Sequence, residues 1–376
     1  MKTIKDINIV LEDKIAFGDI TFNDTIQSIH LKKDEVQGAP YIIPGFIDVH
    51  IHGSASHDAM DATFDAIKGM AQSLIKEGTT SFLPTTMTQS SKNIELALKN
   101  IYEYTKTNPK DEARILGIHL EGPYMNKAAA GAQPFKYIKA PNLNEFKRWQ
   151  KASGNLIKKV SFAPENAGAI AFTRYLKEQN IIPSIAHTKA TYEIVRDAME
   201  AGATSLTHTY NAMTSLHHRN VGVVGAGLLH SELSCELIYD RIHVLKEAAH
   251  ILIKAKGSRG VILITDSMRN KGMPEGVSEL GGQTVYIKKG EARLEDGTLA
   301  GSILKMIDGY HHLIEDFSLS LVEASHMASL NPAVELGVDD ILGSIKENKK
   351  ADLLILDKDY QLKETIIDGK TVYKAK

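Results

Sequence analysis

The sequence contains eight short apolar runs, and seven of them end in a histidine or an acidic residue. Amphipathic stretches separate the runs, and the clearest of these, residues 64–78, carries apolar side chains at helical spacing and closes on Gly78. Continuous apolar runs that alternate with helices are typical of parallel strands covered on both faces. Eight such units favour the α/β class and a TIM-like (β/α)₈ barrel over an open sheet. The runs are residues 46–52, 79–85, 115–121, 160–165, 181–187, 204–208, 235–240 and 261–266.

The two ends of the chain have a different pattern. Residues 1–44 and 341–376 contain short segments in which apolar and polar side chains alternate, as in strands with one buried face. Neither end can bury a sheet face alone, so we expect both to pair into one small β-sandwich subdomain. The barrel then occupies residues 45–340, and within it residues 283–294 predict a hairpin that turns at Gly290.

The polar residues at the ends of the runs indicate a metal site. In a parallel barrel the carboxyl ends of the strands meet at one rim, which is the catalytic face. His50 and His52 are two residues apart, so their side chains lie on the same side of a strand. Glu121 adds an oxygen ligand, and His187 and His208 end two successive runs. Three protein ligands and an open position are the usual arrangement at catalytic zinc.

Asp266, at the end of the eighth run, is the candidate acid–base group. Taken alone it could cap a helix, just as each histidine could be an ordinary core side chain, but together these residues favour a metal-dependent hydrolase. A bound divalent cation lowers the pKa of water from 15.7 towards about 7. Hydrolysis of an amide also needs a group that protonates the leaving nitrogen. We expect Asp266 to act as general base towards the water and then as general acid towards the amine.

Composition excludes several other classes of protein. The net charge is −2, which gives no sign of a nucleic-acid or anionic-membrane surface. No apolar run approaches the roughly 18 residues of a membrane-spanning helix, and the first residues lack the apolar core of a signal peptide. Cys235 is the single cysteine, so an internal disulfide is excluded. We therefore expect a cytoplasmic protein whose partner is a small molecule, with no nucleic acid and no membrane.

Several motifs, in order along the chain, resemble one known family. Residues 44–53 resemble the opening motif of the amidohydrolase superfamily, which leaves the substrate open. Residues 119–124, His-Leu-Glu-Gly-Pro-Tyr, are narrower and resemble the N-acetylglucosamine-6-phosphate deacetylases. The resemblance extends from residue 44 to residue 357, and in combination its motifs are specific. Further segments that match are residues 163–165, 186–188, 207–213, 265–267, 299–302, 331–333 and 343–353.

The resemblance implies an enzyme of amino-sugar metabolism that removes acetate from N-acetyl-D-glucosamine 6-phosphate. By this match the ligands of the main ion are Glu121, His187 and His208. Some members hold a second ion at a His-x-His pair, which this chain has as His50 and His52. We therefore expect one or two divalent ions, zinc first, with iron, manganese, cobalt or nickel as alternatives. The resemblance also implies a homodimer.

The same resemblance implies the contacts with the substrate. Asp266 keeps the role of acid and base. Arg219 pairs with the phosphate, on a loop that a partner subunit can supply in such enzymes. Gln133 stands where some members have a histidine beside the acetyl carbonyl, and glutamine can donate a hydrogen bond there. The other residues predicted to bind or enclose the substrate are Ala132, Asn211, Ala212, Asp240, Arg241, His243, Leu299, Ala300 and Gly301.

Two alternatives stay open at this point. Another metal-dependent amidohydrolase on the same barrel, such as a cyclic-amidase or an N-acyl-amino-acid deacetylase, would use similar ligands. Cyclic-amidases of that type usually carry a bridging modified lysine, and Glu121 stands where that carboxylate is needed. The second alternative is a catalytically inactive scaffold. Such a protein would have no reason to keep all the metal-type residues together with Asp266.

Overall fold

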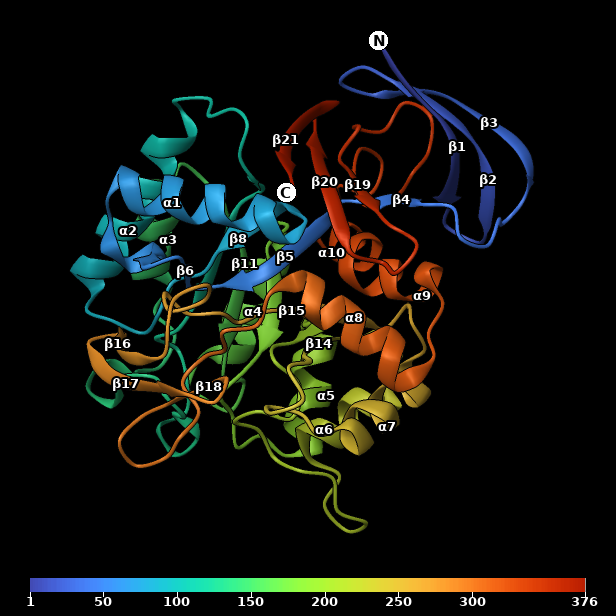
Figure 1. The fold of residues 1–376 in the computed structure, drawn as a ribbon. Helices are drawn as coiled ribbons and strands as arrows, with labels where there is room; N and C mark the ends of the chain where they lie inside the picture. Colours follow the sequence, from blue (N-terminus) through green and yellow to red (C-terminus); the bar gives the residue numbers. More distant parts are fainter. Residues whose placement is uncertain (376) are drawn as a thin grey trace.

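Parallel strands form the core of the protein, which the computed structural model describes for residues 1–375 (Figure 1). A six-stranded sheet has the order β10-β11-β12-β13-β14-β15, and a second sheet has the order β5-β8-β9. Isolated parallel bridges join Thr85 to His119 and Ile51 to Ser267, which link the second sheet to β10 and to the segment after β15. The strands are β5 (Phe46–Ile51), β8 (Thr79–Pro84), β9 (Arg114–Ile115), β10 (Ile118–Glu121), β11 (Ile157–Phe162), β12 (Ile182–Ile185), β13 (Ser205–Leu206), β14 (Ser234–Ile238) and β15 (Val261–Ile264).

Each of the eight predicted runs overlaps at least one of these strands, which confirms the predicted α/β class with parallel strands. The third run is divided, because the chain leaves β9 at Ile115 and enters β10 at Ile118. In the fourth run the strand ends before the run does. β11 stops at Phe162, so Glu165 lies in the following turn instead of on the strand.

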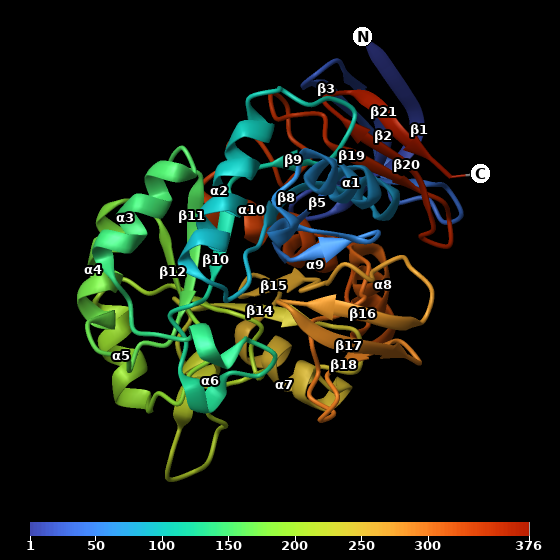
Figure 2. The same ribbon diagram turned by 90° about the vertical axis from the view of Figure 1, so that its left-hand side faces the viewer.

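Helices connect the parallel strands and cover their outer face. Figure 2 shows α3, α4 and α5 along the outside of the strands. The predicted helix is α1, in which Thr63 accepts a hydrogen bond from the backbone of Ala66 at the start. A short 3-10 turn extends it to Gly78, whose left-handed backbone, φ 84°, ends the segment as predicted. The helices are α1 (Phe64–Leu74), α2 (Ser91–Thr105), α3 (Leu143–Ala152), α4 (Ala169–Glu178), α5 (Tyr192–Glu200), α6 (Gly222–Leu229), α7 (Lys246–Lys256), α8 (Met306–Phe317), α9 (Leu321–Ser325) and α10 (Asn331–Leu336).

Both ends of the chain contribute to one seven-stranded sheet with the order β21-β20-β19-β4-β1-β2-β3. β19 pairs antiparallel with β4, and this ladder joins the C-terminal strands to the N-terminal ones. Isoleucines such as Ile9, Ile20 and Ile366 fill a common core between the two groups of strands. The division into two domains at residues 44 and 341 stays a prediction. The strands are β1 (Lys2–Val10), β2 (Ile15–Phe22), β3 (Ile26–Asp34), β4 (Tyr41–Pro44), β19 (Leu353–Leu356), β20 (Leu362–Ile367) and β21 (Lys370–Lys374).

A small antiparallel sheet lies after the last barrel strand. It contains β16 (Gly276–Leu280), β17 (Gln283–Lys288) and β18 (Glu291–Arg293). The predicted hairpin is β17–β18, and it turns through Lys289 and Gly290, whose φ values are 53° and 80°. β16 was not predicted, because its side chains are largely exposed or half-buried and show no strand-like alternation. A two-stranded ribbon, β6 (Gly53–Ser54) with β7 (His57–Asp58), follows β5.

No helix among residues 1–375 has both the length and the apolar character needed to cross a lipid bilayer. The longest helices instead have one buried face against the strands, as in α2, which buries Ile94, Leu98 and Ile101.

The terminal sheet and the barrel share core side chains, so truncation of one such side chain should destabilise the whole fold. Leu354 of β19 is fully buried in the cluster that contains Phe46 and Tyr310. We predict that Leu354→Ala lowers the free energy of unfolding by about 2–5 kcal/mol through lost burial and a residual cavity. The control is Leu96→Ala, at a leucine that is 49% exposed, which should cost less than about 0.5 kcal/mol. Urea unfolding measures both, and equal losses in the two variants would contradict the packing argument.

Candidate metal centre and cavity

The predicted metal ligands converge at the carboxyl ends of the parallel strands. His50 and Glu121 lie on β5 and β10, His52 follows β5 directly, and His187 and His208 lie two residues after β12 and β13. Each of these side chains is buried or almost so. The predicted convergence of distant residues on one rim is therefore present, and their metal-binding roles are a proposal that this geometry supports.

Glu121, His187 and His208 form a compact set of three donor atoms. The Oε1 atom of Glu121 lies 3.2 Å from His208 Nε2 and 3.4 Å from His187 Nε2. The two Nε2 atoms lie 3.1 Å apart. Ligands at about 2.0–2.1 Å from a tetrahedral zinc ion are separated from one another by about 3.3 Å. The three measured spacings match such an ion, and the donor set of two nitrogens and one carboxylate oxygen suits it chemically.

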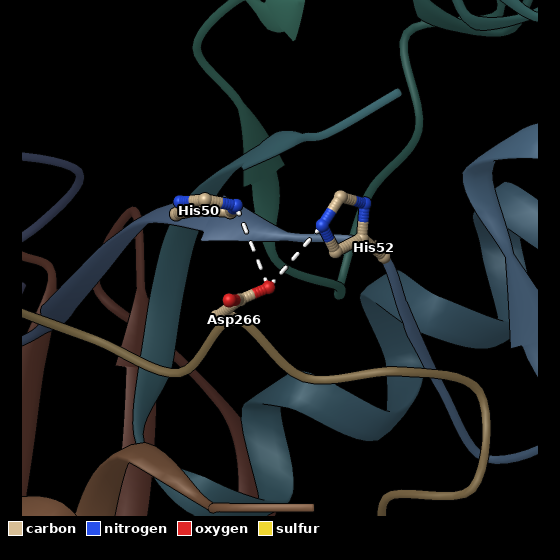
Figure 3. A group of neighbouring side chains, drawn as sticks. All are labelled: His50, His52 and Asp266. Atoms are coloured by element: carbon tan, nitrogen blue, oxygen red, sulfur yellow. Dashed lines mark ion pairs between the residues drawn. The ribbon is translucent and has the colours of Figure 1, made fainter. Parts of the chain in front are cut away.

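His50, His52 and Asp266 form a second set beside the first. Figure 3 shows both imidazoles facing the same oxygen of Asp266. That Oδ1 atom lies 3.2 Å from His52 Nε2 and 3.5 Å from His50 Nε2. The other oxygen of Glu121, Oε2, lies 3.2 Å from His52 Nε2. His50 Nε2 lies 3.6 Å from Oε1, so the carboxylate of Glu121 contacts both sets and could contribute to a site for one ion or for two.

Hydrogen bonds behind the rings fix which nitrogen of His187 and His52 faces the centre. His187 Nδ1 donates to the backbone carbonyl of Ala129 at 2.9 Å, and His52 Nδ1 donates to that of Thr85 at 3.3 Å. A carbonyl can only accept, so Nδ1 carries a proton and Nε2 is the nitrogen that faces inward, where it can bind a cation in place of a proton. The inward Nε2 atom of His50 is buried without a hydrogen-bond partner in the described chain. Inward-facing nitrogens and a buried, unpartnered nitrogen fit a metal ion better than an ordinary polar core.

The charges of the cluster also favour a cation. Burial lowers the pKa of His52, but the carboxylates of Asp266 and Glu121 outweigh burial and raise it to about 10. Burial raises the pKa of Glu121, but His50 and the neighbouring imidazoles outweigh it and hold that pKa well below its ordinary value. The cluster therefore attracts positive charge, and a divalent cation can take the place of protons on the imidazoles.

Glu236 and Lys159 support the centre from inside the barrel, and sequence reasoning missed both. Glu236 Oε2 accepts from His50 Nδ1 and from the backbone N–H of His208, each at 3.0 Å. Lys159 Nζ lies 2.7 Å from Glu236 Oε1 and 2.7 Å from Glu335 Oε2. Burial raises the pKa of Glu236, but Lys159 and His50 outweigh it and keep the carboxylate ionised. One buried anion thus holds residues of both ligand sets.

The backbone is strained where the centre is built. Three of the predicted metal-ligand and acid–base residues have positive φ although none is glycine: 42° at His187, 33° at His208 and 46° at Asp266. Side chains with a Cβ rarely adopt this region, and such strain concentrates at functional sites. All three residues follow the end of a strand, where the turn redirects the side chain from the barrel wall towards the centre.

A cavity of about 350 Å³ opens above the ligands. His52, Glu121, His187, His208 and Asp266 lie at its wall. Most of the predicted substrate residues line it too, namely Ala132, Gln133, Asn211, Ala212, His243, Leu299 and Gly301. Gln133 donates to Glu121 Oε2 at 2.8 Å, so it supports a ligand as well as facing the cavity.

Four predicted substrate residues lie outside the cavity wall. Ala300 is fully buried behind it. Asp240 accepts from His243 Nδ1 at 2.7 Å and so orients a residue that does line the cavity. Arg241 is directed to α8, where it donates to Asp316 at 2.6 Å and Glu315 at 2.9 Å. Arg219 lies on an exposed loop against His218. Their contacts with a substrate stay predictions.

Comparison with known proteins places the chain among characterised hydrolases. Residues 41–372 match the amidohydrolase family. An N-acetylglucosamine-6-phosphate deacetylase of Bacillus subtilis (strain 168) is 43% identical over 385 aligned residues, which cover 99% of this chain and 97% of the relative. An N-acetylgalactosamine-6-phosphate deacetylase of Escherichia coli O157:H7 is 38% identical, with 88% and 87% covered. The crystal structure of N-acetylglucosamine-6-phosphate deacetylase from Thermotoga maritima is similar at a TM-score of 0.93 with 33% identity, and 100% of each chain is covered.

The position of Glu236 behind His50 predicts an effect on metal binding. We expect Glu236→Gln to weaken the affinity for divalent ions by about 10- to 100-fold, because the neutral amide orients His50 less firmly. Glu112→Gln is the matched control, since Glu112 is also buried but contacts Tyr104 away from the centre. Competition with a chelator, read by metal analysis, measures the affinity. Identical titrations of the two variants would rule out this role for Glu236.

Proposed function

The chain belongs to the amidohydrolase family and to its N-acetylglucosamine-6-phosphate deacetylases, and on that premise we propose that it hydrolyses the acetamide of N-acetyl-D-glucosamine 6-phosphate. The products are D-glucosamine 6-phosphate and acetate, as amino-sugar catabolism and recycling require. The observation that carries the proposal is the convergence of Glu121, His187 and His208 on one point, with Asp266 at the same cavity wall. An inactive scaffold would not need to maintain this costly burial of charge.

The ligand spacings support one or two bound divalent ions. Glu121, His187 and His208 would hold the main ion, and His50 and His52 would contribute to a second. A bound divalent cation supplies Lewis-acid polarisation of the amide carbonyl and acidifies water. We propose zinc, because a set of two imidazoles and one carboxylate is common at catalytic zinc, and iron, manganese, cobalt and nickel suit the same donors.

Asp266 has the position that general acid–base catalysis requires. It reaches the cavity wall, and its Oδ1 atom faces His50 and His52. Burial raises its pKa, but the two imidazoles outweigh burial and hold the pKa below its ordinary value, so the carboxylate starts ionised and can accept a proton from water. The same carboxyl group then returns the proton to the leaving nitrogen, which releases the amine as a neutral group.

Two further side chains would orient the substrate in the cavity. Gln133 is held by the backbone N–H of Thr88, which donates to Gln133 Oε1 at 3.0 Å. Its amide N–H₂ contacts Glu121, and a second N–H remains for the acetyl carbonyl. His243 has Nδ1 fixed by Asp240, which leaves Nε2 for a sugar hydroxyl or phosphate. Both side chains are thus oriented before the substrate binds.

The galactosamine epimer is a second candidate substrate, since a relative of 38% identity is named an N-acetylgalactosamine-6-phosphate deacetylase. The two sugars differ in the orientation of one hydroxyl group, and the ligands act on the acetamide that both share. We also propose that the protein is a cytoplasmic homodimer, in which the exposed loop of Arg219 reaches a neighbouring cavity.

Metal dependence and phosphate recognition can be tested together. We predict that the metal-loaded protein releases acetate from N-acetylglucosamine 6-phosphate far faster than from N-acetylglucosamine, because charge-assisted hydrogen bonds to the phosphate add binding energy. Chelation should abolish release, and zinc should restore it. The measurement is acetate production, with N-acetylgalactosamine 6-phosphate as a third substrate. Turnover that survives complete metal removal would contradict the proposed mechanism.

Asp266→Asn tests the acid–base step. We predict a loss of kcat of about 100- to 10,000-fold, because the amide cannot accept and return the proton. The set of Glu121, His187 and His208 stays intact, so the variant should retain at least one ion by metal analysis and should still bind D-glucosamine 6-phosphate. Near-full activity in a metal-loaded Asp266→Asn variant would remove Asp266 from the mechanism.

A further inference from the structure

The charge of the cavity wall is unevenly distributed. The carboxylates of Glu121 and Asp266 lie at the wall together with the imidazoles of the centre. Of the described residues that line the cavity, Lys189 is the one lysine or arginine. The backbone N–H of Lys189 donates a hydrogen bond to Glu165. The exposed ammonium of Lys189 forms no ion pair with the described part of the chain. A permanent cation is thus available at the cavity and is not neutralised by a neighbouring carboxylate.

The two arginines predicted to bind the substrate have other contacts in this chain. Arg241 is paired with Asp316 and Glu315 on α8. Arg219 contacts His218 on an exposed loop and does not reach the cavity of its own chain. Lys189 is therefore the one lysine or arginine of the described chain that an anionic substrate group would find at the cavity wall.

The backbone that carries Lys189 is fixed on both sides. Glu165 accepts from the Lys189 N–H at 2.6 Å and from the hydroxyl of Thr188 at 2.5 Å. Glu165 also accepts from the side-chain amide of Asn126 at 2.7 Å, so its charge is directed at this turn and not at the cavity. The Thr188 N–H donates to the carbonyl of Ala212 at 3.0 Å. The turn of Lys189 is thereby bonded to the Asn211–Ala212 segment, which also lines the cavity.

We propose that Lys189 binds the 6-phosphate of the substrate and so contributes to the preference for phosphorylated sugars, an inference that rests on the proposed deacetylase function. An ammonium offers three donors on a flexible stem and suits a phosphate as a point charge. In a hexopyranose the carbon that bears the 6-substituent lies across the ring from the carbon that bears the acetamide. With the acetamide at the metal ligands, the phosphate extends towards the open side of the cavity, where the exposed Lys189 side chain lies.

The test compares Lys189→Gln with Lys127→Gln in the metal-loaded protein. Lys127 lies on the short helix Lys127–Ala129 beside the cavity, but its ammonium stacks over the ring of Phe135. For N-acetylglucosamine 6-phosphate we expect Lys189→Gln to raise KM by about 10- to 100-fold and to change kcat by less than about threefold. KM for unphosphorylated N-acetylglucosamine should not change. Lys189→Arg should restore most of the loss, and Lys127→Gln should resemble the parent protein.

Two readouts separate failure of this inference from failure of the proposed function. Calorimetry measures the binding of D-glucosamine 6-phosphate and of D-glucosamine, and it does not depend on turnover. If the parent protein hydrolyses the phosphorylated substrate and Lys189→Gln has the same KM and the same affinity for D-glucosamine 6-phosphate, the role of Lys189 is overturned. A different result would be that the parent protein releases no acetate, while Lys189→Gln binds D-glucosamine 6-phosphate more weakly than the parent does. In that case the deacetylase function fails and the phosphate site stands.

Discussion

The burial of several charges at one end of the barrel is the constraint on which the rest of the site depends. Glu121 and Asp266 are both almost fully buried, and four imidazoles face them. Burying unpaired carboxylates is costly, so the cluster must carry compensating positive charge, either as protons on the histidines or as metal ions. The three donors of the Glu121 set are spaced for one ion, and Glu121 turns its second oxygen to His52 of the other set. The spacing of the donors and the charge of the cluster therefore both favour a bound metal ion.

A buried charge pair inside the barrel, below the rim, supports the cluster. Lys159 and Glu236 are fully buried on β11 and β14, where a chain of this kind would usually place branched apolar residues. Their pairing neutralises Glu236, and Glu236 in turn holds the ring of His50 and the backbone of His208. The proposed ligands are thus fixed by the strands themselves and by a charge pair between strands. This makes the centre more rigid than one built on loops alone.

The sequence predicted the parts of this arrangement that follow from periodicity and topology. Parallel strands bring their carboxyl ends together, so a histidine or carboxylate that ends an apolar run can be placed at the rim without knowing any contact. Glu165 shows the limit of this rule, because β11 ends at Phe162 and the turn sends Glu165 towards Thr188 and away from the metal ligands.

Glu236 and Lys159 could not be found in this way. Lys159 follows Lys158 just before the fourth apolar run, and Glu236 is a single charge within the seventh. The significance of each depends on a partner from another strand. Arg241 was predicted at the cavity, but two carboxylates on α8 attract its guanidinium, and sequence spacing contains no information on that competition.

The residues proposed for hydrolysis and those proposed for substrate preference lie on different parts of the fold. The ligands and Asp266 are held by strand ends, interior charges and strained backbone, so their positions depend on the whole fold. Lys189 and the Asn211–Ala212 segment lie on turns beyond the strands, where the Thr188 N–H donates to Ala212 and Asn211 donates to the carbonyl of His208. A change in these turns can alter which sugar phosphate binds while the hydrolytic centre keeps its geometry. Relatives that act on different epimers of one amino sugar are consistent with this division, because the acetamide chemistry is common to both and the recognition of the rest of the sugar is not.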